Sequence, residues 1–139
     1  MVAFLTPLLG ACATSQDASS PVKVRQLLST QTTSSGQPLV LPDGDLEVIV
    51  SIYDIAAGAS LPSHRHPALR YGYVLSGKLS VTNEETLQTQ IYRAGDFIIE
   101  AIDQWHHARN PGGKAAKLLV IDQVRPGQAN VILRPKGER

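Results

Sequence analysis

The four histidines of this 139-residue chain stand in two short groups, His64 with His66 and His106 with His107. Residues two apart on a strand point to the same face, so His64 and His66 are expected to share one. Because His106 and His107 are adjacent, at most one of them can join that pair. Neutral imidazoles ligate divalent transition metals. The pattern predicts either a metal site or a cluster of hydrogen-bonded histidines lining a pocket without metal.

The segments that must position these histidines are predicted to be short strands separated by turns. Apolar residues alternate with period two from Leu46 to Ile52, which is typical of a strand. Further strands are expected at residues 73–75, 79–81, 87–91, 97–99, 117–124 and 131–133. Glycine-containing turns recur at intervals of roughly ten residues, as in a sandwich or barrel. We therefore expect one all-β domain over residues 22–135.

Composition excludes several classes of protein. Lys and Arg number 13 against 12 Asp and Glu, for a net charge of +1, so nothing suggests the basic face of a nucleic-acid binder. One cysteine excludes an internal disulfide framework and a multi-thiolate zinc cage. Serine-nucleophile elbows and glycine-rich nucleotide motifs are absent from the sequence.

The first 20 residues are expected to lie outside the folded domain. The apolar run from Val2 to Leu9 is too short to span a membrane, which needs roughly 20 residues. The string LGAC ending at Cys12 resembles a bacterial lipobox, in which the cysteine is lipidated after cleavage of the leader. This predicts a periplasmic or membrane-anchored lipoprotein on a polar tether. The first basic residue is Lys23, so an ordinary N-terminus with a chance cysteine, and a cytoplasmic location, stays open.

Two longer strings carry a family resemblance. GASLPSHRHPALRYGYVLSG, from Gly58 to Gly77, resembles the first cupin motif, and GDFIIEAIDQWHHARN, from Gly95 to Asn110, resembles the second. The resemblance covers about residues 37–126. It implies a jelly-roll double-stranded β-barrel that closes its sheet edges around a pocket. It also implies a homodimer.

The motif positions designate His64, His66 and His106 as ligands of a divalent metal such as Fe, Zn, Ni or Mn. The first motif usually supplies a glutamate as the fourth ligand, but Arg70 stands there, and a guanidinium cannot ligate a metal. Ala101 and Asp103 replace the usual proline and glycine of the second motif, which puts the loop geometry in doubt.

Three interpretations of Arg70 remain open. It could anchor an anionic substrate beside a three-histidine metal site. It could mark a cupin that has lost its metal and binds an anionic or sugar-like molecule. It could also turn outward to a surface carboxylate, and Asp54 is a further possible partner if it faces inward.

Two functional hypotheses follow. The first is an envelope cupin that binds a divalent metal, a small and probably anionic molecule, or both, without turnover. The second is a non-haem metal-dependent dioxygenase or isomerase acting on a small acid. Neither involves nucleic acid, and contact with a membrane is expected only through a lipid on Cys12.

Overall fold

The computed structural model describes residues 21–137, and its regular structure consists of nine strands. They are β1 (Glu47–Ile55), β2 (Ser60–Arg65), β3 (Leu69–Ser76), β4 (Lys78–Asn83), β5 (Thr89–Arg93), β6 (Phe97–Ile99), β7 (His106–Arg109), β8 (Ala116–Val124) and β9 (Ile132–Leu133). No helix in this part of the chain is long and apolar enough to cross a membrane.

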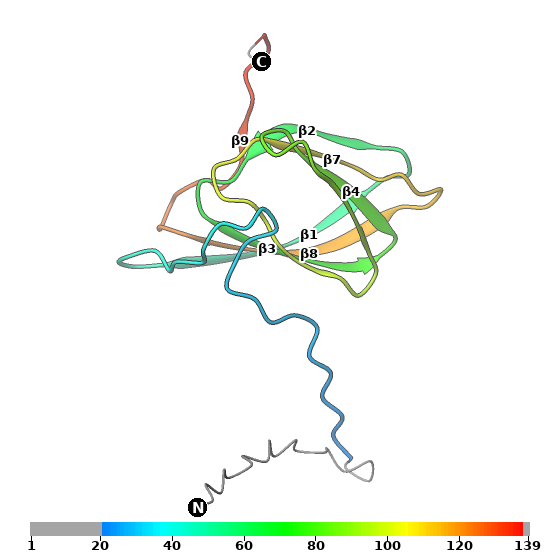
Figure 1. The fold of residues 1–139 in the computed structure, drawn as a ribbon, viewed down its shortest axis with the longest axis horizontal. Coiled ribbons are helices and arrows are strands. Elements are labelled where there is room, and N and C mark those ends of the chain that lie inside the picture. Colours follow the sequence, from blue (N-terminus) through cyan, green and yellow to red (C-terminus); the bar gives the residue numbers. More distant parts are fainter. Residues whose placement is uncertain (1–20, 138–139) are drawn as a thin grey trace, which may run out of the picture.

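The strands form two facing sheets, with the orders β1-β8-β3-β6 and β5-β4-β7-β2-β9 (Figure 1). All paired strands are antiparallel. This confirms the all-β fold and its cupin-type jelly-roll architecture. The expectation of closed sheet edges is wrong, because no strand ladder joins the two sheets in the described residues. Side chains between the layers, and not a continuous barrel, hold them together.

The core lies between the layers because alternate residues of each strand face inward. Ile55, Val74 and Val120 project from one sheet, and Leu79 and Ala108 from the other. Each exposes 6 % or less of its surface. Aromatic residues make up only 5 % of the chain, and aliphatic side chains fill the core.

A glycine turn joins β3 to β4. Gly77 has φ +76°, and a Cβ there would lie 2.8 Å from the Cα of Ala116. Both the left-handed backbone and the close approach of β8 therefore require glycine at this position.

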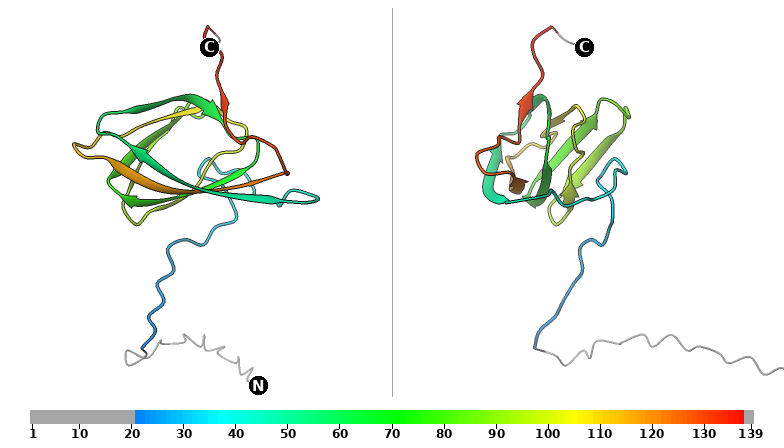
Figure 2. Two further views of the ribbon diagram at one scale, coloured as in Figure 1. Left: turned by 180° about the vertical axis from the view of Figure 1, so that it is seen from behind. Right: turned by 90° about the vertical axis from the view of Figure 1, so that its left-hand side faces the viewer.

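Segments before β1 and after β8 run alongside the two sheets (Figure 2). The Ser34 amide donates to the carbonyl of Ile99 at the end of β6. The Gln37 side chain donates to the carbonyl of Ile102 and accepts from its amide, at 2.7 and 2.8 Å. From the other terminus, β9 pairs with β2. Residues 34–37 and β9 therefore hold segments next to residues of the site described below.

The loop of the second motif keeps its shape without the usual glycine. Asp103 has φ +55°, a left-handed conformation that Asp adopts more readily than most residues. Its carboxylate pairs with Arg65 at 2.9 Å. The replacement questioned from the sequence is thus accommodated locally.

Candidate metal centre

Three of the four histidines converge between the sheets. His64 comes from β2, His66 follows the end of that strand, and His106 begins β7. Their ring centroids lie 4.4 to 4.9 Å apart, and each residue exposes 6 % or less of its surface. His64 and His106 are cross-strand partners. The spatial grouping of His64, His66 and His106 is the one expected from the motifs.

A register shift places the first histidine correctly. The pairing of β2 with β7 is irregular between Leu61 and His64. Leu61 packs against the core, and His64 also faces inward although it is three residues further along the strand. A bulge of this kind re-aims a side chain that strict alternation would turn outward.

The backbone fixes which ring nitrogen each histidine offers. The Nδ1 atoms of His64, His66 and His106 lie 2.7, 2.6 and 2.9 Å from the carbonyl oxygens of Pro62, Asn130 and Gln104. A carbonyl only accepts, so each Nδ1 carries a hydrogen and donates it. The neutral ring then presents the lone pair of Nε2, as metal-binding histidines commonly do.

A carboxylate completes the group. Glu100 places Oε2 3.0 Å from the Nε2 of His66 and 3.2 Å from that of His106. One ligand atom from each of His64, His66, Glu100 and His106 can be chosen so that all lie within 4.8 Å of one another. The carboxylate that the motif leads one to expect at position 70 is thus supplied here by Glu100, which directly follows β6 and belongs to the second motif.

Glu100 is the member of this group that was not predicted from the sequence. Its signal is weak because it follows the run Phe97-Ile98-Ile99, in which Ile98 and Ile99 are both buried. Ile98 packs in the core, whereas Ile99 lies beneath the N-terminal segment. Because both isoleucines are apolar, the sequence does not show which of them faces the core. With Ile98 facing the core, Glu100, two residues further on, would be expected to face the histidines.

The group has the donor chemistry of a cation site. The Nε2 atoms of His66 and His106 are 3.2 Å apart, which brings two lone pairs together when both rings are neutral. Glu100 adds a negative oxygen to the same point. Such a cluster of acceptors is stabilised by a proton or by a metal ion. The residues present therefore fit a divalent transition metal, for which three imidazoles and one carboxylate are suitable ligands.

Electrostatics in the metal-free protein agree with this. Burial opposes ionisation of Glu100, but its contacts with His106 and His66 outweigh burial and hold the pKa of Glu100 below its usual range. Burial opposes protonation of His106, but Glu100 raises the pKa of that ring. Burial, the largest effect on His64, lowers its pKa to about 4. His64 is therefore neutral and Glu100 is ionised, so the cluster presents a negative charge to a cation.

Arg70 lies inside the barrel, so the expectation of an outward-facing side chain is wrong. It is 5 % exposed, and its Nε and Nη2 donate to the two carboxylate oxygens of Asp122 at 2.7 and 2.9 Å. Arg70 and Asp122 are cross-strand partners on β3 and β8. Asp54 is not its partner, because that carboxylate is exposed and pairs with Lys117 at 3.3 Å.

Asn130 connects the arginine pair to the histidines. Its side-chain nitrogen donates to Asp122 at 2.7 Å, and its side-chain oxygen accepts from the amide of Ala68. Its own carbonyl accepts from Nδ1 of His66 at 2.6 Å. The C-terminal segment therefore orients one of the clustered histidines.

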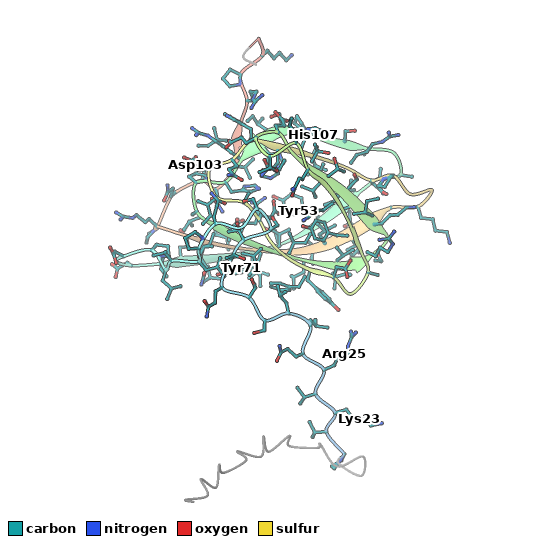
Figure 3. The ribbon with its side chains drawn as sticks, in the orientation of Figure 1. Lys23, Arg25, Tyr53, Tyr71, Asp103 and His107 are labelled. Atoms are coloured by element: carbon teal, nitrogen blue, oxygen red, sulfur yellow. The ribbon has the colours of Figure 1, made fainter. Side chains whose placement is uncertain are left out.

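The remaining sequence candidates lie elsewhere. His107 points away from the cluster and pairs with Glu84 at 3.0 Å on the surface, as its parity predicts (Figure 3). The ring centroid of Trp105 lies 5.0 Å from the guanidinium carbon of Arg65 and 4.6 Å from that of Arg134. Cys12 lies outside the described residues.

Two cavities meet at the cluster, and Glu100 and His106 line both. Tyr53 and Arg70 join His64 in the wall of the inner cavity. Tyr53 lies between the two sheets (Figure 3). The outer cavity lies against the N-terminal segment. Three of the four candidate ligands, all except His66, therefore line a cavity.

The comparisons agree with this architecture. The sequence profile of the cupin domain family matches residues 51–122, just over half of the chain. The protein therefore belongs to the cupin family. No curated protein sequence matches it.

Solved structures with the same fold include several enzymes. An oxalate oxidase in complex with the substrate analogue glycolate is 26 % identical, with a TM-score of 0.52, over 62 % of this chain and 45 % of that one. The DMSP lyase DddQ of Ruegeria pomeroyi is 23 % identical, with a TM-score of 0.57, over 66 % and 45 %. The polyketide cyclase RemF of Streptomyces resistomycificus is 22 % identical, with a TM-score of 0.53, over 66 % and 65 %. The matched region spans less than half of the oxidase and of the lyase.

Proposed function

We propose that this cupin binds a divalent transition metal through His64, His66, His106 and Glu100 and uses it to hold a small molecule. The proposal rests on the close approach of the three histidine Nε2 atoms and the Glu100 carboxylate. Iron, zinc, nickel and manganese are the candidate ions. When bound, such an ion polarises a carbonyl or hydroxyl oxygen of the molecule beside it.

The chain's own residues have separate tasks in this proposal. Backbone carbonyls hold the three rings in the tautomer that presents Nε2. Glu100 lowers the positive charge of the centre by one. The apolar wall of the inner cavity, including Leu118 and Val120, keeps the site poor in water, which strengthens electrostatic contacts there.

Elemental mass spectrometry of untagged protein tests metal binding. Wild type reconstituted anaerobically with Fe(II), Zn(II), Ni(II) or Mn(II) should retain stoichiometric metal after desalting. His106→Ala should lose it, and His107→Ala, one residue away but on the surface, should keep it. Melting curves show whether His106→Ala is folded. Absence of metal from reconstituted wild type would refute the proposal.

Turnover at this centre is a second candidate function, as a non-haem metal-dependent dioxygenase or isomerase acting on a small acid. The two cavities that reach Glu100 and His106 favour it, as does the 26 % identity to an oxalate oxidase. Oxygen consumption by the iron- and manganese-loaded protein, with oxalate and glycolate as substrates, tests the first activity. Solvent deuterium incorporation into a panel of small hydroxy acids tests the second. No activity with any metal would leave a binding protein.

Anchoring of an anion by Arg70 remains a prediction. Arg70 lines the inner cavity, but Asp122 already accepts from two of its nitrogens. An anion there must use the remaining N–H groups. Arg70→Lys keeps the charge and loses the planar fork, so it should weaken anion binding if the anchor exists. Unchanged binding of glycolate would remove that role.

Attachment to the bacterial envelope through Cys12 is likewise proposed from the sequence. The LGAC string is its support. Expression in a bacterial host with labelled palmitate, followed by fractionation, tests it with Cys12→Ala as control. A label-free soluble protein would contradict the lipid anchor.

We also propose a homodimer through the outer face of the β1-β8-β3-β6 sheet. Val48, Val50 and Ile52 on the edge strand β1 are 57, 60 and 52 % exposed, an unusual apolar row for a free surface. Light scattering should give twice the chain mass, and Val50→Lys should give a monomer. A monomeric wild type at all concentrations would contradict the dimer.

A further inference from the structure

The outer cavity has a wall of uncharged hydrogen-bonding side chains. It lies beside Glu100 and His106 and is partly open to solvent. Its polar wall contains Ser34, Asn83, Thr86, Gln88, Gln90 and Tyr92. Each of these side chains can both donate and accept a hydrogen bond.

His106 is the one basic side chain that lines this cavity. Lysine and arginine are absent from the residues that form its wall, all of which belong to the described part of the chain. Glu100 is its one acidic residue. Arg70 lines the inner cavity instead and is held by Asp122. An anion entering from outside would therefore approach a carboxylate with no arginine or lysine to compensate, and only His106 or the metal could attract it.

Several polar groups in the wall have no partner within residues 21–137. The hydroxyl of Thr86 and the side-chain amide of Gln88 make no hydrogen bond there. The oxygen of Gln90 accepts from the Tyr92 hydroxyl, which leaves the nitrogen of that amide unused. A ligand that covers these groups must supply hydrogen-bonding partners, because leaving them unpaired costs binding energy.

Apolar side chains form the rest of the wall. Val81, Ile98 and Ala101 lie beside the polar groups and close to the metal ligands. A molecule that fits both surfaces carries C–H faces together with several hydroxyl groups. We propose that the outer cavity binds an uncharged polyhydroxylated molecule, a sugar or polyol. This deepens the proposed function, since a hydroxyl at the Glu100 end would reach the metal; binding in the cavity does not itself require the metal.

Saturation-transfer NMR tests the ligand class. The probes are myo-inositol and D-xylose, compared with succinate and glycolate, added to Zn(II)-loaded and to metal-free protein. The variant Gln88→Leu/Gln90→Leu removes two amides from the wall. Gln128→Leu is the matched control, because that glutamine is exposed on a loop outside the cavity.

We expect at least one of the two polyols to bind wild type and the control, and its affinity to fall about tenfold or more in the double variant. Binding of the acids without either polyol would overturn the ligand class, as would polyol binding unaffected by the double variant. Absence of binding by every probe would overturn it too. Polyol binding to a protein that retains no metal would refute the metal proposal alone, so the two failures are distinguishable.

Discussion

Two groups of ionisable side chains are buried between the sheets, and they differ in whether hydrogen-bond donors and acceptors are matched. In the Arg70–Asp122 pair, donors meet acceptors, and Asn130 supplies a further donor to the carboxylate. In the histidine cluster, acceptors face acceptors, with two Nε2 atoms 3.2 Å apart beside the carboxylate of Glu100. The first group is satisfied by the protein alone. The second group requires a cation or a proton, and this difference separates a structural pair from a binding site.

The largest expected effect is on stability, at the arginine pair. Asp122→Ala leaves Arg70 buried without its counter-charge and should lower the free energy of unfolding by about 3–5 kcal/mol. Chemical denaturation of the metal-free protein measures this. Asp54→Ala, which breaks the exposed pair with Lys117, is the control and should cost about 1 kcal/mol or less. Equal costs would mean that the buried pair is not a structural requirement.

The next effect is on metal affinity, at the cluster. Glu100→Gln keeps the size of the side chain but removes its charge, and it should weaken metal binding by about 100-fold or more. Competition with a chromophoric chelator measures the affinity. A loss of stability in the metal-free variant as large as that of Asp122→Ala would erase the distinction between the two groups.

Asn130 joins both groups and should show a smaller effect on each. Asn130→Ala removes the hydrogen bonds to Asp122 and Ala68 that hold the carbonyl facing His66. Metal affinity should fall about tenfold, and unfolding should become easier by about 1–3 kcal/mol. Gln128→Ala in the same segment is the control. A change in stability without any change in metal affinity would show that Asn130 does not position His66.

The smallest effect concerns the surface histidine and sharpens the contrast with its buried neighbour. Burial acts to raise the pKa of Glu84, but the contacts with His107 and Arg134 outweigh it and lower that pKa. The interaction should therefore stabilise the fold above the usual glutamate pKa and be lost as the pH falls through the lowered value. Glu84→Gln should lower the free energy of unfolding by about 1 kcal/mol or less at pH 7 and should leave it unchanged at acidic pH. Thermal melts at a series of pH values measure the difference. A difference in stability that does not change with pH would show that packing, and not charge, causes it. Asp43→Asn is the control for an exposed carboxylate.

The local pattern was enough to predict the fold and three members of the cluster. Alternating apolar residues and glycine turns predict strands wherever one face is buried, and two motifs in the right order predict the cupin architecture. The grouping of His64, His66 and His106 follows from the same motifs. The strands depend on neighbours in sequence, so spacing alone predicts them. The architecture and the grouping of histidines up to 42 positions apart are what the family resemblance implies.

Only the tertiary structure decided which carboxylate joins the histidines and what Arg70 contacts. Glu100 reaches the cluster because β6 pairs with β3 and the N-terminal segment covers Ile99. Asp122 meets Arg70 because β8 pairs with β3 in a register set by the whole sheet. The contact of Glu100 with His66 joins residues 34 positions apart, and that of Arg70 with Asp122 joins residues 52 apart. The alternation of a single strand contains no information about its partner's register. The residue types were visible in the sequence, but the pairing of the strands determined their roles.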